Sequence, residues 1–328
     1  MIDLDLEDAA RYLDDQDKLH NINKPIEVPV VQEQTRPNLG VVDSYTELSA
    51  ASESSWKILD TRGLPSQGLF YPEHSELLLR PAKTKEIRHW STIDENDPID
   101  VREKINFILN SCTKFTIKGQ GIPLNFNDFI EIDRYHILFR IYELTFPNQE
   151  NKLWANIKCE NTKCSHINQT QVLSQNLRGF KIPEELMKWY SPEEKCFKII
   201  SEKLQETIRI YMPTIGIENR FDQRLTKERD TGIEIDKSFY EFGPYLVKEW
   251  RPATSASLTQ LKMASLGWPE NKFVFIHKFT KMLKDASLNK AMVACEKCKE
   301  VTESHIFLEG SFTVKDIFII SARLDELI

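Results

Sequence analysis

Four cysteines in two short pairs are the residues of this chain best suited to chemistry. Cys159 and Cys164 are separated by four residues, and Cys295 and Cys298 by two. Thiolate sulfur is a preferred ligand of zinc, and four thiolates complete a tetrahedral shell that leaves no position open for water or substrate. The spacing therefore predicts one structural zinc ion per chain, held by two pairs that lie about 130 residues apart in the sequence.

Disulfides and free buried thiols are the alternatives to a zinc site. The chain starts Met-Ile-Asp-Leu-Asp, without the basic and apolar stretches of a signal peptide, so reduced cysteines are favoured. His166 follows Cys164 closely and is an alternative ligand in place of one thiolate, although a surface position is the simpler interpretation. Cys112 and Cys196 have no partner at metal-binding spacing and are expected to be buried apolar thiols.

Apolar residues flank both cysteine pairs in the pattern of short strands. They precede and follow each pair, which predicts two hairpins facing each other, the arrangement of a zinc ribbon: Leu153, Trp154, Ile157, Val172 and Leu173 around the first pair, and Met292, Val293, Ile306, Phe307 and Leu308 around the second.

Other elements must position these hairpins. Turn formers mixed with β-formers over residues 58–72, and a strand pattern over 76–80, predict a small β layer. Asp97 before Pro98 predicts the start of a helix running to about 111, and Asp128 with Glu131 predicts a capping box that opens a helix running to about 145.

The middle of the chain is expected to be mainly helical. Its predicted elements are a loop at 177–190, strands within 196–211, an exposed charged helix at 218–229, helices at 237–250 and 258–266, and a buried helix at 273–283.

These elements predict an α+β fold with four parts. Residues 1–55 form an acidic extended arm, residues 56–150 an α+β domain, residues 151–176 with 288–328 a split zinc-ribbon region, and residues 177–287 a mainly helical insert. Residues 1–50 contain eleven acidic and four basic side chains, which accounts for the whole net charge of −7. Such a polar segment does not fold alone; it is expected either to stay disordered or to drape over a partner.

The composition argues against two classes of partner. No apolar run reaches the ~18 residues of a membrane span. The chain after residue 50 is neutral overall, so no basic field favours nucleic acid.

Catalytic motifs are also missing from the sequence. It contains no Gly-x-Ser-x-Gly elbow, no phosphate-binding loop and no His-Glu-x-x-His helix. The cluster of Asp94, Glu95, Asp97 and Asp100 could hold a hard cation, but its place at a helix start favours capping. We therefore expect a protein that is not an enzyme.

The order of motifs resembles one viral family. A Leu-Pro-Ser-x-Gly-Leu-x-Tyr segment begins at Leu64, an Asp-led helix containing Arg140 follows, and then come the first cysteine pair, the turn at Pro213 and the late Cys-x-x-Cys. This order is similar to that of the baseplate hub and hub assembly proteins of T4-like contractile-tailed bacteriophages. The chain departs from that family in the four residues between Cys159 and Cys164, where two are usual, and in the acidic arm.

The resemblance implies a virion protein of the tail baseplate, made in the cytoplasm of the host bacterium. It implies other baseplate and tail proteins as partners, in a symmetric hetero-oligomeric assembly, with the arm contacting several neighbours. The motif itself is the expected docking surface, unless its aromatic residues only seal the local core: Leu64, Pro65, Leu69, Phe70 and Tyr71.

Two other functions remain open from the sequence. One is a transient hub assembly factor that is absent from the mature virion. The other is a zinc-ribbon regulatory protein that binds nucleic acid or the transcription machinery.

Overall fold

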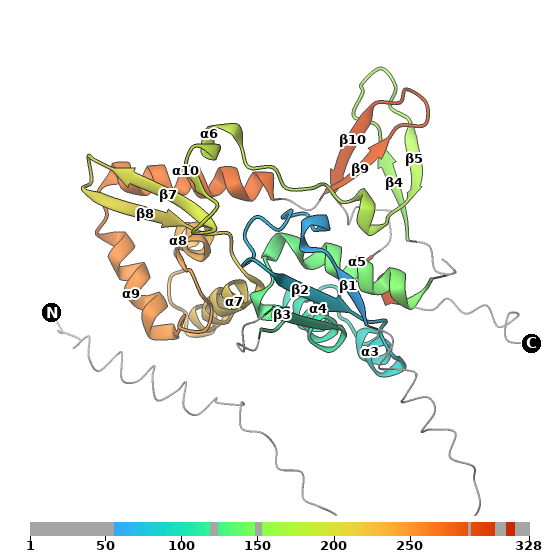
Figure 1. Ribbon diagram of the computed structural model, residues 1–328, viewed down its shortest axis with the longest axis horizontal. Helices are drawn as coiled ribbons and strands as arrows, with labels where there is room; N and C mark the ends of the chain where they lie inside the picture. The colour runs from blue at the N-terminus through green and yellow to red at the C-terminus, as the bar shows by residue number, and fades with distance from the viewer. Residues whose placement is uncertain (1–55, 119–123, 148–152, 288–289, 306–312, 319–328) are drawn as a thin grey trace, which may run out of the picture.

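The computed structural model describes residues 56–118, 124–147, 153–287, 290–305 and 313–318. Helices and strands are mixed along the chain, as the predicted α+β class requires. Figure 1 shows three parts: a helical body around a small sheet, a lobe beside it, and a pair of hairpins that projects from one end. The predicted arm, residues 1–55, lies outside the described residues.

The body is built on an antiparallel sheet of three strands in the order β1-β2-β3. These strands are β1 (Lys57–Leu59), β2 (Ser75–Leu79) and β3 (Thr113–Ile117). β3 alternates buried and exposed residues, so one face packs inward, and the predicted β layer is confirmed with one strand more. A 3-10 turn, η1 (Thr61–Gly63), lies between β1 and β2.

Helices α3 (Thr84–Trp90), α4 (Pro98–Cys112) and α5 (Arg134–Thr145) complete the body. α4 confirms the predicted helix: the Asp97 side chain accepts from the Ile99 backbone N–H, and Pro98 occupies the first turn. Asp100 and Glu95 also accept backbone N–H groups, from Asp94 and Lys315. The acidic cluster is therefore occupied in capping and loop contacts.

The helix expected to begin at Asp128 begins later. Two 3-10 turns come first, η2 (Phe126–Asp128) and η3 (Glu131–Asp133), and α5 starts only at Arg134. The capping box is displaced because the Asn125 side chain caps η2, while the Asp128 carboxylate reaches back to the Asn125 N–H. The predicted box of Asp128 with Glu131 is wrong, and the predicted end near 145 is confirmed.

The lobe combines a second antiparallel sheet with helices. Its strands, in the order β6-β7-β8, are β6 (Tyr190–Ser191), β7 (Cys196–Ser201) and β8 (Glu206–Ile210). Its helices are α6 (Glu184–Met187), α7 (Ile215–Asp230), α8 (Lys237–Phe242), η5 (Gly243–Leu246), α9 (Ser255–Leu266) and α10 (Glu270–Ala286). The predicted strands within 196–211 and the helices near 258–266 and 273–283 are confirmed; the loop predicted at 177–190 contains the short α6.

Two expectations for the lobe are wrong. The helix predicted over 237–250 stops at Phe242, because Gly243 packs against Phe221 and Pro244 cannot donate a backbone hydrogen bond. The charged helix α7 is not simply exposed: Phe221 and Glu228 are buried, and Glu228 accepts from Arg224 and Lys262.

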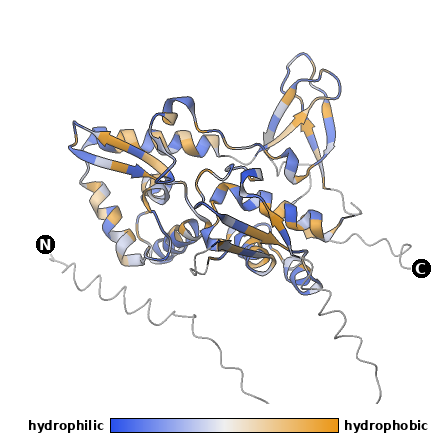
Figure 2. Cartoon of the chain, in the orientation of Figure 1, coloured by the Kyte–Doolittle hydropathy of each residue, from blue (hydrophilic) through white to orange (hydrophobic). Residues whose placement is uncertain are grey.

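The hairpins consist of β4 (Trp154–Lys158) with β5 (Ile167–Gln171), and β9 (Lys290–Ala294) with β10 (Val301–His305). A 3-10 turn, η4 (Ser174–Asn176), follows β5, and η6 (Lys315–Phe318) packs on α3 and α5. Apolar and polar residues alternate along the hairpins in Figure 2. The inward residues join one hydrophobic core that continues through the body and the lobe.

Candidate metal centre

The four predicted cysteines meet at the tip of the two hairpins. Their sulfur atoms all lie within 4.8 Å of one another, and among the described residues they form the one group of three or more metal-ligand side chains. Cys159 and Cys298 are 3.6 Å apart at sulfur, and Cys164 and Cys295 are 3.8 Å apart. The two pairs, about 130 residues apart in sequence, thus form one cluster.

These distances fit four sulfurs around one tetrahedral ion. With metal–sulfur bonds near ~2.3 Å, a tetrahedron has sulfur–sulfur edges of about 3.8 Å. A disulfide needs about 2.05 Å, and all six cysteines are free thiols, so the disulfide alternative is wrong. Four sulfurs would fill the coordination shell of the ion. Such a centre could hold the two hairpins together but would leave no coordination position open for a substrate.

Short turns present the sulfurs of both pairs. In the first turn, Ser165 adopts a left-handed backbone with φ 47°, and the Cys159 N–H donates to the His166 carbonyl over 2.8 Å. In the second, Lys299 has φ 64°, and its N–H donates to the Cys295 carbonyl over 2.8 Å. These left-handed residues reverse the chain just after each cysteine pair.

Backbone N–H groups also favour the thiolate form in the second turn. The Cys298 N–H and then the Lys297 N–H donate to the Cys295 sulfur and lower its pKa to about 6. Because the thiolate is the form that binds metal, this turn prepares one ligand. His166 contributes its carbonyl to the Cys159 N–H and is not a member of the sulfur cluster.

Two buried polar residues connect the hairpins beneath the sulfurs. The Asn168 side chain in β5 accepts from the Glu296 N–H over 2.9 Å, and the Thr302 hydroxyl in β10 accepts from the Glu160 N–H over 3.3 Å. Each hairpin therefore supports the cysteine turn of the other. Sequence reasoning missed both residues, although their polar side chains at inward-facing strand positions were the available signal.

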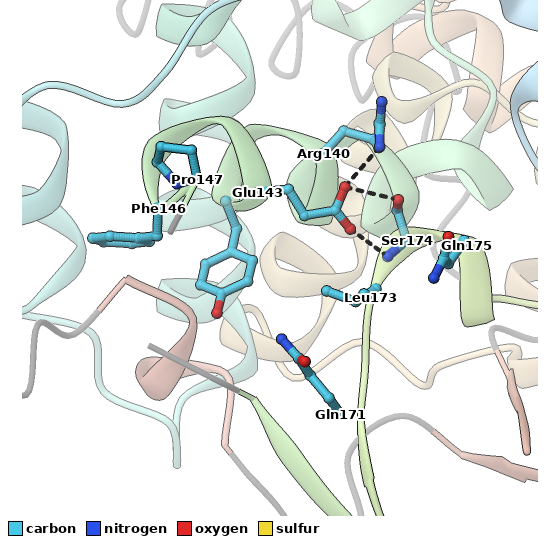
Figure 3. A pocket seen from close by; sticks show the side chains of 9 residues that line it. Arg140, Glu143, Phe146, Pro147, Gln171, Leu173, Ser174 and Gln175 are labelled. Carbon is cyan, nitrogen blue, oxygen red and sulfur yellow. Dashed lines mark hydrogen bonds and ion pairs between the residues drawn. The ribbon is translucent and has the colours of Figure 1, made fainter. Parts of the chain in front are cut away.

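The hairpins are anchored to the body by one carboxylate on α5. In Figure 3, the Glu143 carboxylate accepts hydrogen bonds from the Ser174 N–H at 2.7 Å and from the Ser174 hydroxyl at 3.0 Å. The Arg140 guanidinium donates to the same carboxylate at 2.8 Å. This contact borders an open pocket of about 180 Å³. It sets the direction in which the chain leaves β5.

Arg178 attaches the second hairpin to the same connecting segment. Its backbone N–H donates to the Lys290 carbonyl, and its guanidinium pairs with Glu303 in β10, both at 2.8 Å. The guanidinium also donates to the Ala286 carbonyl at the end of α10. The segment after β5 therefore contacts both hairpins and the lobe, which restrains the cluster with respect to the remainder of the fold.

The predicted docking motif is mostly buried. Leu64, Phe70 and Tyr71 are 2%, 7% and 2% exposed, Pro65 is buried, and Leu69 is half-buried. An exposed anchor made by these residues is therefore ruled out, and the alternative, in which they seal the local core, is correct. Phe70 packs edge-on against Tyr190, and Tyr71 against Phe115.

The polar residues of the motif bind a buried carboxylate. Asp133 accepts from the Ser66 N–H at 2.8 Å, from the Ser66 hydroxyl at 2.6 Å and from the Tyr71 hydroxyl at 2.8 Å. The Tyr71 oxygen in turn accepts from the Ile130 N–H. Burial raises the pKa of Asp133 to about 6 despite these donors. The hydrogen bonds of the motif thus connect the loop after β1 to the start of α5.

Comparisons with known proteins found no relative of this chain. No family model, no curated protein and no solved structure matches the chain. Within its described part, no helix has both the length and the apolar character needed to cross a bilayer.

Proposed function

We propose that this chain is a structural component of a bacteriophage contractile-tail baseplate, in its hub region. It acts by protein–protein contact, carries one structural zinc ion, and performs no reaction. The sulfur cluster is the observation that carries the structural role, because four converging thiolates leave a bound ion no position for substrate. The order of the sequence motifs supports the place in the tail.

Zinc is the ion that best suits this donor set. Four thiolates select soft or borderline ions, and zinc combines a tetrahedral preference with the absence of redox chemistry. In the proposed zinc ribbon, Cys159, Cys164, Cys295 and Cys298 supply all four ligands. The ion would join chain segments on either side of the lobe, so its binding free energy would contribute to folding.

Replacement of one ligand tests the metal. Cys298→Ser should lower the metal content from one zinc per chain to below one tenth, and the hairpins should lose stability with it. Cys196→Ser is the matched control, because Cys196 is a buried cysteine outside the cluster. Mass spectrometry of metals, combined with protein quantitation, gives the ratio. An unchanged zinc content in Cys298→Ser would refute the assignment.

The role in the tail is tested with particles. Quantitative mass spectrometry of purified mature virions, calibrated against a known tail protein, should find several copies of the chain per particle. Absence of the chain, together with failed tails in a deletion strain, would instead identify an assembly factor. Absence with normal tails would overturn the viral assignment altogether.

The arm has its own test within this proposal. Deleting residues 1–55 should prevent baseplate assembly while the remaining chain keeps its unfolding transition, because residues after the arm build a large hydrophobic core with one another. Normal particles from such a deletion would show that the arm is dispensable.

A further inference from the structure

The four cysteines of the sulfur cluster differ in their access to solvent. Cys298 is exposed and Cys164 is half-buried, whereas Cys159 and Cys295 are buried. Oxidation of a cysteine depends on its exposure as well as on its thiolate character. A small oxidant in solution therefore reaches Cys298 first, and the other three sulfurs lie directly behind it.

Two of the sulfur contacts in the cluster run from one hairpin to the other. Cys159 is 3.6 Å from Cys298, and Cys164 is 3.8 Å from Cys295. The sulfurs of a disulfide are near 2.05 Å apart, so an approach of about 1.6 Å would join the first pair and about 1.8 Å the second. Rotation of the cysteine side chains about their Cα–Cβ bonds gives movements of this size while the strands stay in place.

Hydrogen bonds that do not involve sulfur hold the two cysteine turns against each other. Asn168 and Thr302 each accept from a backbone N–H of the opposite turn, at 2.9 Å and 3.3 Å. The Asn161 amide, in the first turn, donates to the Glu300 carboxylate of the second at 2.6 Å. These contacts keep the sulfurs of the two hairpins opposite each other while an ion leaves.

We propose that oxidation exchanges the zinc ion for two disulfides that join the same two hairpins, one between Cys159 and Cys298 and one between Cys164 and Cys295. The inference rests on the proposed function, because a particle assembled in a reducing cytoplasm and then released enters oxidising surroundings. The ion holds the hairpins together during assembly, and the disulfides hold them together afterwards.

The exchange balances with hydrogen peroxide as the oxidant. The Cys298 thiolate attacks one peroxide oxygen, the O–O bond breaks, and hydroxide leaves a sulfenic acid on the sulfur. The Cys159 thiolate then attacks that sulfur, the S–S bond forms, and a second hydroxide leaves. A second peroxide joins Cys164 and Cys295 in the same way. Two peroxides thus accept four electrons from four thiolates and yield two disulfides, four hydroxide ions and one free zinc ion.

Peptide mapping identifies which cysteines are joined. Four cysteines allow three connectivities, and trypsin separates all of them because lysines lie between the cysteines of each turn. Each cysteine falls on a peptide of its own: residues 159–163, 164–178, 291–297 and 298–299. The zinc-loaded full chain is treated with two equivalents of hydrogen peroxide, blocked with N-ethylmaleimide in urea, and digested without reductant. Mass spectrometry should find the two proposed links in at least tenfold excess over any other.

Zinc release and protease resistance are followed in the same samples. A colorimetric chelator should report one zinc released for two peroxides consumed. The oxidised, zinc-free chain should resist trypsin at Lys163 and Lys297 as well as the zinc-loaded chain does, and a reductant added with the chelator should make cleavage there at least tenfold faster. Cys196→Ser is the matched control and should behave as the parent chain, because Cys196 lies outside the cluster.

Three results would overturn the exchange. Links within one turn, Cys159 to Cys164 or Cys295 to Cys298, would show that oxidation leaves the hairpins unjoined. Sulfinic or sulfonic acid at Cys298 in place of a disulfide would show that no second sulfur reaches the oxidised one. Retention of zinc after two equivalents of peroxide would show that the ion protects its ligands.

The zinc content before oxidation separates this inference from the proposed function. A chain that binds no zinc would refute the metal centre of the proposed function and the exchange together. A chain that binds one zinc and then forms other links would refute the exchange alone.

Discussion

Asp133 is a buried carboxylate that hydrogen bonds from distant residues partly compensate. Its carboxylate is fully buried and receives three donors from Ser66 and Tyr71, which come from a loop more than 60 residues earlier in the chain. A carboxylate in such a place costs free energy when ionised, because hydrogen bonds replace only part of its hydration. Its pKa near 6 expresses that balance.

The raised pKa of Asp133 predicts a pH dependence of stability with a definite sign. Between pH about 4 and 6 the folded chain retains a proton that the unfolded chain has released. The contribution of Asp133 to the free energy of unfolding therefore falls as the pH rises through this window, by about 3 kcal/mol in total. Asp133→Asn should abolish this term, so the stability difference between the two chains should change over the same range.

Denaturant unfolding of both chains from pH 4.5 to 7.5 measures that difference. The comparison with the variant is needed because His136 acts in the opposite direction: burial lowers its pKa to about 4, so its contribution to stability rises with pH over an overlapping window. Asp230→Asn, at the exposed end of α7, is the control. A stability difference for Asp133→Asn that is constant with pH would contradict the prediction.

At the scale of elements, helix α7 connects the lobe to the body. Thr214 caps its N-terminus, its neighbour Ile215 donates a backbone hydrogen bond to Phe129 in the body, and an isolated bridge pairs Ile130 with Thr214. The helix approaches the body closely at Gly216. A β-carbon there would lie 2.5 Å from the Trp250 ring and 2.9 Å from the Asn127 side chain.

Gly216→Ala should therefore destabilise the chain, although alanine favours a helix. The helical preference for alanine contributes about 1 kcal/mol, whereas overpacking costs about 1–3 kcal/mol and more where the obstacle is held in place. The Trp250 ring is restrained from moving aside, because its indole N–H donates a hydrogen bond to Asp128 at 2.8 Å. We expect a net loss of about 1–2 kcal/mol by denaturant unfolding.

Gly63→Ala provides the matched control for this substitution. A β-carbon at Gly63 would meet no atom within 4 Å, so that variant should keep the stability of the parent chain or gain slightly. Equal effects of the two substitutions would mean that the contact between α7 and the Trp250 loop does not restrain the lobe.

The sulfur cluster closes a loop of the chain that contains the entire lobe. Cys164 and Cys295 are separated by the entire lobe, yet their sulfurs are 3.8 Å apart. Bringing such distant segments together costs chain entropy that grows only slowly with loop length, at (3/2)RT ln n. A bound ion would offset this cost in the projecting hairpins, whose strands bury the apolar residues Ala155, Ile157, Ala291 and Val293.

Metal removal should therefore act on the hairpins first. With a strong zinc chelator, trypsin should cleave at Lys163 and Lys297 in the cysteine turns at least tenfold faster, while the body and lobe stay protected. Lys203, exposed in the turn between β7 and β8, is the internal control and should be cut at an unchanged rate. Mass spectrometry of the fragments over time gives both rates.

Uniform acceleration at Lys163, Lys297 and Lys203 would indicate general unfolding rather than local opening. No acceleration at the cysteine turns would mean that the hydrogen bonds of Asn168 and Thr302 suffice to hold the hairpins together.

Local patterns determined much of this protein from sequence alone. The spacing of the cysteines identified the four side chains that meet in the sulfur cluster, because short turns place such side chains through local backbone geometry. The start of α4 followed from Asp97 and Pro98, since capping also involves neighbouring residues only. The apolar stretch of α10 was also recognisable, because its pattern lies within one continuous segment of the chain.

Tertiary structure decided the features that depend on distant contacts. Leu64 and Tyr71 are buried because Asp133, far along the chain, binds the loop that holds them, and no local pattern reports that partner. The early end of α8 likewise depends on a distant contact, the packing of Gly243 against Phe221. The 3-10 turn η2 before α5, in contrast, rests on the local cap by Asn125. Spacing determines which residues can bind or cap, whereas burial depends on which distant surfaces of the chain meet.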